Sequence, residues 1–215
     1  MNFFNLHTSI EAAALLSGLL LFKNYRNTPL KWALPFLFFI MMTETAGWII
    51  RHRYSHTNGM LYNFTIPIEY SFYFFLFSQY ILFKNLKRIM LVGWIALFFY
   101  CIVQFYFSGI YLFIPAILLL GNCLMILCCC FYFWQLFQIE EERPLLKIPI
   151  FWIFMGVFLF NLGELSYSLF ARIMIEQLDK YANFFGLLIN ILIIVLYSCF
   201  IIGFSLKDYR YKHEY

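Results

Sequence analysis

Apolar stretches of about 20 residues follow one another at short intervals along this sequence. A helix needs about 20 apolar residues to cross the roughly 30 Å hydrocarbon core of a bilayer, because it rises about 1.5 Å per residue. The composition agrees, since 64% of the 215 residues are hydrophobic and only 12% are charged. So few charges cannot cover the surface of a soluble domain, which excludes a cytosolic enzyme, a nucleic-acid binder and a disordered regulator. The sequence therefore predicts an integral membrane protein.

Seven such stretches make up a single all-α domain covering residues 1–215. They lack the period-two alternation of barrel strands, and backbone polar groups in lipid must be satisfied within the segment, so we expect helices. Short polar breaks separate them, for example at 27–29 and 140–144. The expected transmembrane helices cover residues 7–23, 32–50, 60–83, 89–107, 110–138, 148–171 and 182–206.

Basic residues are distributed unevenly between the two ends of the expected helices. Lys and Arg accumulate in the cytoplasmic segments of membrane proteins. If the N-terminus is outside, the outer segments hold only four of the 15 basic residues, namely Arg51, Arg53, Arg172 and Lys180. We therefore predict an outer N-terminus and an inner C-terminus, in the inner (plasma) membrane of a bacterium. The net charge of +4 is explained by this topology, and no nucleic-acid partner is expected.

Four acidic residues lie inside the expected helices, each on a different one: Glu11, Glu44, Glu69 and Glu164. An ionisable side chain in the bilayer costs on the order of 3 kcal/mol, and such groups face the bundle interior and often mark functional sites. Counted from the outer helix ends, the four acids lie roughly 6 to 14 Å deep, all in the outer half of the membrane. The sequence therefore predicts a polar cavity that opens to the outside.

Other polar residues extend the faces on which these acids lie. Residues three, four or seven positions apart share one helical face, so Glu164 shares a face with Asn161 and Ser168, and Ser168 with Arg172. Asn122, near mid-membrane, is the expected floor of the cavity. The alternative role of such side chains is hydrogen bonding between helices. The residues predicted to bind a ligand are Glu11, Glu44, Asn63, Glu69, Tyr73, Asn161, Glu164, Arg172 and Asn190.

The inner half of the bundle is expected to be dry, because segments 34–42, 148–158 and 192–196 contain no ionisable side chain. A proton or ion path through the bilayer would need polar groups at successive depths. The pattern therefore favours sensing over conduction. Our first hypothesis is a receptor-like sensory protein that binds a small molecule or ion from the outer side and signals through a separate cytoplasmic or membrane partner.

Two other functions stay open. A small-solute or proton-coupled transporter would use Glu69 or Glu164 as a group that titrates during turnover. A metal-dependent membrane lipid hydrolase would need a zinc centre at the outer face. The candidate zinc ligands are His7, His52, His56, Glu44 and Glu69. An enzymatic role is the less favoured of the readings.

A weak internal repeat links the second and third expected helices to the sixth and seventh. Glu44 and Glu164 are 120 residues apart, as are Asn63 and Asn183. The implied 3+1+3 layout resembles that of seven-helix sugar facilitators and, more loosely, microbial rhodopsins and G-protein-coupled receptors. Retinal is excluded because residues 182–206 contain no lysine, and no cofactor is expected.

The Phe-, Ile- and Tyr-rich style of the chain, as in segments 61–64 and 149–153, also resembles small seven-helix membrane proteins of Bacteroidota. This resemblance implies a fold and no particular activity.

Overall fold

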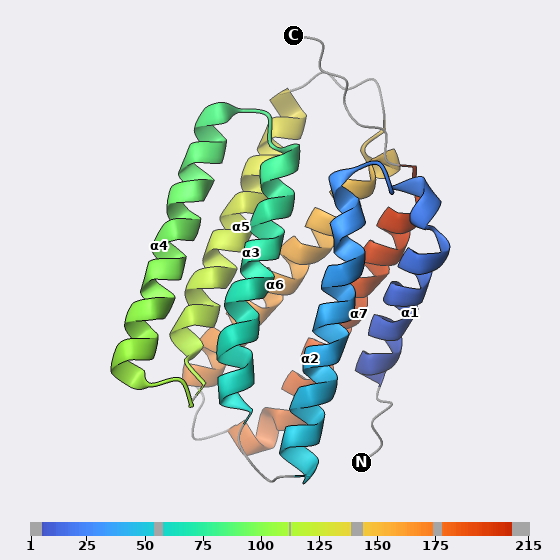
Figure 1. The fold of residues 1–215 in the computed structure, drawn as a ribbon. Helices are drawn as coiled ribbons and strands as arrows, with labels where there is room; N and C mark the ends of the chain where they lie inside the picture. Colours follow the sequence, from blue (N-terminus) through green and yellow to red (C-terminus); the bar gives the residue numbers. More distant parts are fainter. Residues whose placement is uncertain (1–5, 54–57, 112, 139–143, 174–177, 208–215) are drawn as a thin grey trace.

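The computed structural model describes residues 6–53, 58–111, 113–138, 144–173 and 178–207, with the side chains of 6–7, 170–173 and 178–185 left aside. The described residues form seven α-helices and no strand (Figure 1), which confirms the all-helical prediction. The α-helices are α1 (Leu6–Leu20), α2 (Ala33–Arg53), α3 (Gly59–Tyr80), α4 (Lys84–Ser108), α5 (Pro115–Gln138), α6 (Pro149–Ile173) and α7 (Leu178–Ser205). Three short 3-10 helices, η1 (Phe22–Asn24), η2 (Pro29–Trp32) and η3 (Leu145–Lys147), lie in the connections.

Successive helices run in alternating directions, so that the connections gather at two ends of the bundle (Figure 1). We call these the N-terminal end, at the bottom of Figure 1, and the C-terminal end, at the top. Six helices form a ring in the order α1, α2, α3, α5, α6, α7, and α7 contacts α1 again. α4 packs outside this ring against α3 and α5. The interior of the ring is therefore lined by every α-helix except α4.

Among the described residues, five helical segments are long and apolar enough to cross a membrane: Pro29–Arg53, Lys84–Ser108, Pro115–Gln138, Pro149–Leu169 and Gly186–Ser205. α1 is apolar, but its 15 residues extend only about 22 Å. α3 has 22 residues but falls outside this group, because polar side chains such as Asn63 and Glu69 interrupt its apolar sequence. On the outer faces, side chains such as Val92 and Phe99 of α4 are exposed and suit contact with lipid.

Several helix ends differ from the predicted ranges. α4 begins at Lys84 rather than 89 and α7 at Leu178 rather than 182, because a helix can continue into polar sequence whereas hydropathy marks only its apolar part. α5 begins at Pro115 rather than 110. Gly109, with a φ of +74°, ends α4, and Pro115 suits the first turn of a helix, where its missing N–H is not needed. Residues 109–111, 113 and 114 are thus part of a connection and not of a helix.

The connection between α1 and α2 ties the ring together at the C-terminal end. Asn24 Nδ2 donates hydrogen bonds to the carbonyl oxygens of Phe204 and Ser205, at 3.1 and 3.3 Å, and so caps the end of α7. The Tyr25 hydroxyl donates to the Gly18 carbonyl at 2.5 Å, and its ring stacks on Phe204 at 4.8 Å. Burial raises the pKa of Tyr25 to about 12, so this hydroxyl remains a donor at physiological pH.

A buried amide holds the connection between α3 and α4. The Gln135 side chain of α5 is 2% exposed. Its Oε1 accepts a hydrogen bond from the Leu82 N–H at 2.6 Å, and its Nε2 donates to the Tyr80 carbonyl at 3.1 Å. Gln135 was not predicted to have a structural role, because that role depends on a connection more than 50 residues away in the chain.

Candidate functional site

The four acids of the helices line one cavity of about 400 Å³ inside the ring, towards the N-terminal end. We call it the acidic cavity. Its polar lining consists of Glu11, Thr43, Glu44, Tyr62, Thr65, Glu69, Tyr70, Asn122, Asn161, Glu164 and Tyr197. Its apolar lining consists of Ile40, Ile66, Phe113, Leu118, Phe160, Ile189, Ile193 and Leu196. These residues come from all six ring helices and from the connection before α5.

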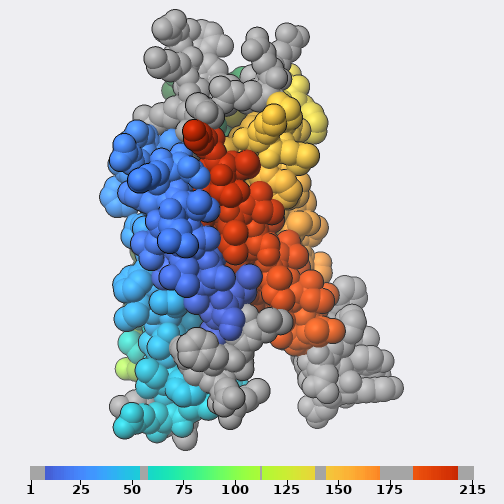
Figure 2. Space-filling model, turned by 90° about the vertical axis from the view of Figure 1, so that its right-hand side faces the viewer, coloured from blue at the N-terminus to red at the C-terminus, as the bar shows by residue number. Residues whose placement is uncertain are grey.

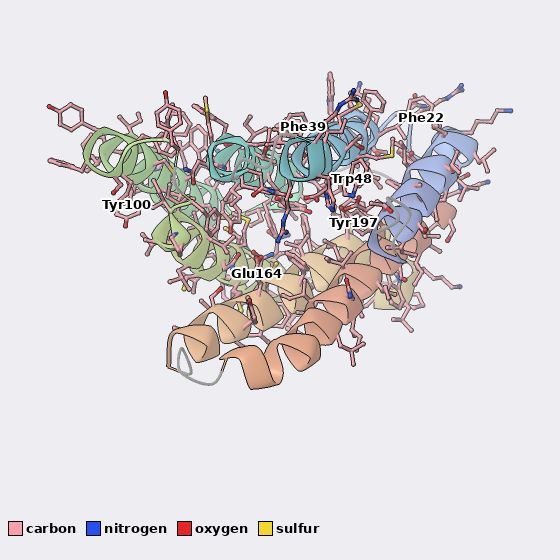
Figure 3. All side chains as sticks on the ribbon, turned by 90° about the horizontal axis from the view of Figure 1, so that it is seen from below. Phe22, Phe39, Trp48, Tyr100, Glu164 and Tyr197 are labelled. Atoms are coloured by element: carbon pink, nitrogen blue, oxygen red, sulfur yellow. The ribbon has the colours of Figure 1, made fainter. Side chains whose placement is uncertain are left out.

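The oblique course of α6 and α7 makes room for this cavity. Figure 2 shows α7 packed beside α1 and slanting away from α2 towards the N-terminal end. In the view from below, Glu164 of α6 and Tyr197 of α7 lie on the inner side of their helices, towards α2 and α3 (Figure 3). Both residues line the cavity.

Two of the four carboxylates accept hydrogen bonds from tyrosines on neighbouring helices. The Tyr197 hydroxyl donates to Glu11 Oε1 at 3.0 Å, which joins α7 to α1. The Tyr62 hydroxyl lies 3.2 Å from Glu44 Oε2 and 3.4 Å from Oε1, which joins α3 to α2. Glu11 is only 4% exposed, whereas Glu44 is half-buried. These two acids therefore contribute to helix packing as well as to the cavity wall.

Glu69 differs from these two acids. Its half-buried carboxylate makes no hydrogen bond or ion pair with any residue that the structure describes. The carboxylates of Glu11, Glu44 and Glu164 lie close enough to repel a negative charge on Glu69. Like charges held together in a poorly solvated site repel one another. Glu69 thus has no hydrogen-bond donor to stabilise its carboxylate among the described residues.

Asn122 of α5 lies beside the fourth carboxylate, that of Glu164. Its side chain is fully buried, and its Oδ1 accepts a hydrogen bond from the Tyr70 hydroxyl at 2.7 Å. The same hydroxyl lies 3.1 Å from the Leu118 carbonyl. Asn122 Nδ2 is near Glu164 but meets no acceptor at hydrogen-bonding distance within the described part of the chain. The position of Asn122 in the cavity wall agrees with its expected place at the floor.

The other polar lining residues satisfy their donors within their own helices. Thr43, Thr65 and Asn161 each donate to the backbone carbonyl three or four residues earlier, at 2.7 to 2.9 Å. Such bonds leave these side chains little capacity to donate to a ligand. The charged chemistry of the cavity therefore rests on its four carboxylates, because no Lys, Arg or His is among the described lining residues.

Asn63, predicted to bind a ligand, does not line the cavity. It is 1% exposed and holds the connection between α4 and α5. Its Nδ2 donates to the Ile110 carbonyl at 3.0 Å, and its Oδ1 accepts from the Ile114 N–H at 3.1 Å. Backbone groups in a connection have no partners within a helix, so a buried amide satisfies both. Asn63 thus stabilises a connection at the N-terminal end through its buried amide, as Gln135 does at the C-terminal end.

Three other predicted residues are also not placed in the lining. Tyr73 lies deeper along α3, is 4% exposed and packs edge-on against Phe36 at 5.3 Å. Asn190 is exposed on α7 at a level where Ile189 and Ile193 face the cavity. Arg172 belongs to α6, and its side chain is outside the described part of the structure. The five predicted residues that line the cavity are Glu11, Glu44, Glu69, Asn161 and Glu164.

The tyrosines of the lining were not among the predicted ligand-binding residues. Tyr62 lies seven residues before Glu69 and therefore shares a face of α3 with that acid, whereas Tyr70 directly follows Glu69 and lines the cavity beside it. This spacing was a usable signal for Tyr62. The contact between Tyr70 and Asn122, 52 residues away, joins two different helices. The spacing of residues along one helix could therefore not predict it.

The proposed zinc ligands are only partly described. The His52 ring is exposed at the end of α2, where Nδ1 lies 3.0 Å from the Trp48 carbonyl and the ring stacks on Trp48. The His7 side chain and His56 lie outside the described residues. Among the side chains that are described, no group of three or more His, Cys, Asp or Glu could hold a metal ion.

We expect the substitution Glu69→Gln to stabilise the protein in the absence of ligand. It replaces a carboxyl group whose ionised form is disfavoured by burial and by three neighbouring carboxylates, so the free energy of unfolding should rise by about 1 kcal/mol. Thermal unfolding in detergent near neutral pH measures the change. The control Tyr197→Phe removes the hydroxyl that Glu11 accepts from and should lower the stability by about 1 kcal/mol. A lower midpoint for Glu69→Gln than for the wild type would show instead that this carboxylate holds the bundle together.

In comparisons with known proteins, no family model, no curated protein and no solved structure matches this chain.

Proposed function

We propose that this chain is a receptor-like membrane protein with seven spanning helices, which binds a small molecule in the acidic cavity and signals through a separate partner protein. The observation that carries this proposal is the meeting of four carboxylates from α1, α2, α3 and α6 in one cavity of about 400 Å³. Cavities of this size suit small-molecule ligands. Ionisable side chains within apolar helices are costly, which is why they commonly mark functional sites.

Packed aromatic side chains beyond the cavity favour sensing over passage of a solute. Phe77 of α3 and Phe154 of α6 are fully buried and stack at 3.9 Å, and Tyr132 of α5 meets Phe154 edge-on at 4.6 Å. Phe77 and Phe154 lie eight and ten positions further towards the C-terminal end than Glu69 and Glu164, the acids of the same helices. A dense core of this kind can transmit a shift in helix packing from one end of the bundle to the other.

The charge distribution supports an outer N-terminal end and a cytoplasmic C-terminal end. The exposed basic residues at the C-terminal end are Lys23, Arg26, Lys31, Lys84, Lys87, Arg88, Lys147 and Lys207. At the N-terminal end, the exposed basic residues that the structure describes are Arg51 and Arg53. Such a bias is expected of a membrane protein whose C-terminal end is cytoplasmic, and we propose the plasma membrane of a bacterium as the location. In that orientation the acidic cavity lies in the outer half, and the partner protein would meet the basic inner end.

Hydrogen–deuterium exchange of the full-length chain in lipid nanodiscs tests the receptor function. A mixed panel of small cations, neutral molecules and anions supplies the ligand. A receptor should show altered exchange around the cavity and also at the opposite end, in residues 21–32 and 144–148. Glu164→Gln, within the cavity, should weaken both changes in exchange. Glu141→Gln removes the same charge from the sequence between α5 and α6 and should leave both changes as large as in the wild type. A ligand that alters exchange only around the cavity would argue against a receptor.

A small-solute or proton-coupled transporter is the second candidate. The carboxylate of Glu69 favours it, because a group with no hydrogen-bond partner among the described residues is able to bind and release a proton without breaking a contact. Counterflow of a bound solute into liposomes, abolished in Glu69→Gln, would establish transport. Binding without counterflow would leave the receptor as the function.

A further inference from the structure

The acidic cavity has charges of one sign only on its described lining. Four carboxylates from four helices face it, and no Lys, Arg or His is among the described residues that line it. The positive charge of Arg51, at the end of α2, is close enough to interact electrostatically with the lining residue Tyr62. The Arg51 side chain itself is exposed and does not line the cavity. An anion would add a further negative charge to a poorly solvated site, whereas a cation would compensate the charges already there.

An unpartnered donor is a second and independent feature of the same cavity. Asn122 is fully buried, and its Oδ1 is occupied by the Tyr70 hydroxyl. Asn122 is among the residues that line the cavity, and its buried Nδ2, which lies beside Glu164, has no acceptor at hydrogen-bonding distance among the described residues. Buried donors are nearly always satisfied, so this N–H points to an acceptor atom on a bound molecule.

The remaining lining is apolar or aromatic. Phe113 and Phe160 present ring surfaces, and isoleucines from α2, α3 and α7 complete the wall. Aromatic faces attract organic cations, and an apolar wall suits a ligand with a hydrocarbon body. A cavity of about 400 Å³ is larger than a bare metal ion needs. No described group of three or more acidic, His or Cys side chains is placed to hold a metal.

We propose that the acidic cavity binds a small organic amine that carries an apolar body and one hydrogen-bond acceptor. The Glu69 carboxylate is the counter-ion of the ammonium group, since Glu11 and Glu44 already accept hydrogen bonds from Tyr197 and Tyr62 and Glu164 has the Asn122 amide beside it. Asn122 Nδ2 donates to the acceptor atom of the ligand, and the isoleucines and phenylalanines enclose its apolar body. This inference rests on the proposed function, because it names the class of ligand for the same cavity.

Three probes that share one carbon skeleton test the class of ligand. Phenylethanolamine is a cation at neutral pH, phenylethylene glycol is its neutral analogue and mandelate is the anion. Binding to the full-length chain in nanodiscs is measured by isothermal titration calorimetry. We expect saturable binding of phenylethanolamine, at least about 10-fold tighter than that of the glycol, and no binding of mandelate. Equal or tighter binding of the glycol or mandelate, or no binding of phenylethanolamine, would overturn the proposal.

Two variants assign the amine to the cavity. Glu69→Gln should weaken phenylethanolamine binding by at least about 10-fold while the protein stays folded, and Glu141→Gln should bind like the wild type. Unchanged binding in Glu69→Gln would overturn the role of Glu69. Amine binding without altered exchange at the far end would refute the receptor and leave this inference standing. Binding of the glycol as tightly as the amine, with altered exchange at the far end, would refute this inference and leave the receptor function standing.

Discussion

Replacing Gly121 with alanine should lower the free energy of unfolding by about 3 kcal/mol, because α3 and α5 are in closest contact at this position. A β-carbon on Gly121 would lie 1.9 Å from Cε2 and 2.3 Å from Cζ of the Tyr70 ring. Tyr70 is 4% exposed, and its ring forms part of the wall of the acidic cavity. Displacing its ring would also break the hydrogen bonds of its hydroxyl to Asn122 Oδ1 and the Leu118 carbonyl.

Thermal and denaturant unfolding of purified Gly121→Ala in detergent measures this loss. Gly186→Ala is the matched control, since Gly186 lies in α7 and a β-carbon there would meet no atom within 4 Å. Alanine favours a helix over glycine, so the control should be as stable as the wild type or slightly more stable. Gly121→Ala with unchanged stability would mean that α3 and α5 are further apart than the structure shows.

Replacing Asn63 with leucine should cost about 3 kcal/mol of stability, because two buried backbone groups lose their partners together. The Ile110 carbonyl and the Ile114 N–H both bond to the Asn63 amide. Hydrogen–deuterium exchange should accelerate in residues 109–114, and the thermal midpoint should fall. Asn190→Leu is the control, because Asn190 is exposed on α7, and it should change the stability by less than about 0.5 kcal/mol.

The same variant distinguishes the two roles that Asn63 has been given. From its place in the sequence, Asn63 is predicted to bind a ligand. In the structure, Asn63 instead stabilises a connection and does not line the cavity. An Asn63→Leu protein that is as stable as the wild type but fails to bind phenylethanolamine would support the first role. A less stable protein with normal affinity at a temperature where it remains folded would support the second.

Helical structure and the approximate helix ranges could be predicted because they follow from properties of single segments. Each expected range overlaps an observed helix, and the largest differences occur at the start of α4, where Lys84 extends the helix beyond its apolar part, and at the start of α5, where the helix begins only at Pro115. The four acids could be selected for the same reason, since an ionisable residue within an apolar stretch stands out in the sequence. All four line the acidic cavity.

The remaining members of the site could not be predicted with the same rule. Asn63, Glu69 and Asn190 are all polar residues within apolar helices, yet only Glu69 lines the cavity. A spacing of three, four or seven residues shows which side chains share a face but not which neighbour that face meets. The sequence also gave no reason to leave α4 outside the ring of helices.

Taken alone, the sequence determined that this protein is helical, that it suits a membrane, and that its scarce acids lie at similar depths in four helices. These properties depend on the thickness of a bilayer and on the cost of placing a charge in it, which act on each segment separately. The tertiary structure alone decided that the acids share one cavity, that Tyr70 packs on Gly121 and reaches Asn122, and that Asn63 supports a connection. Such contacts depend on the rotation of each helix and on its neighbours, and these are set by packing between segments far apart in the chain.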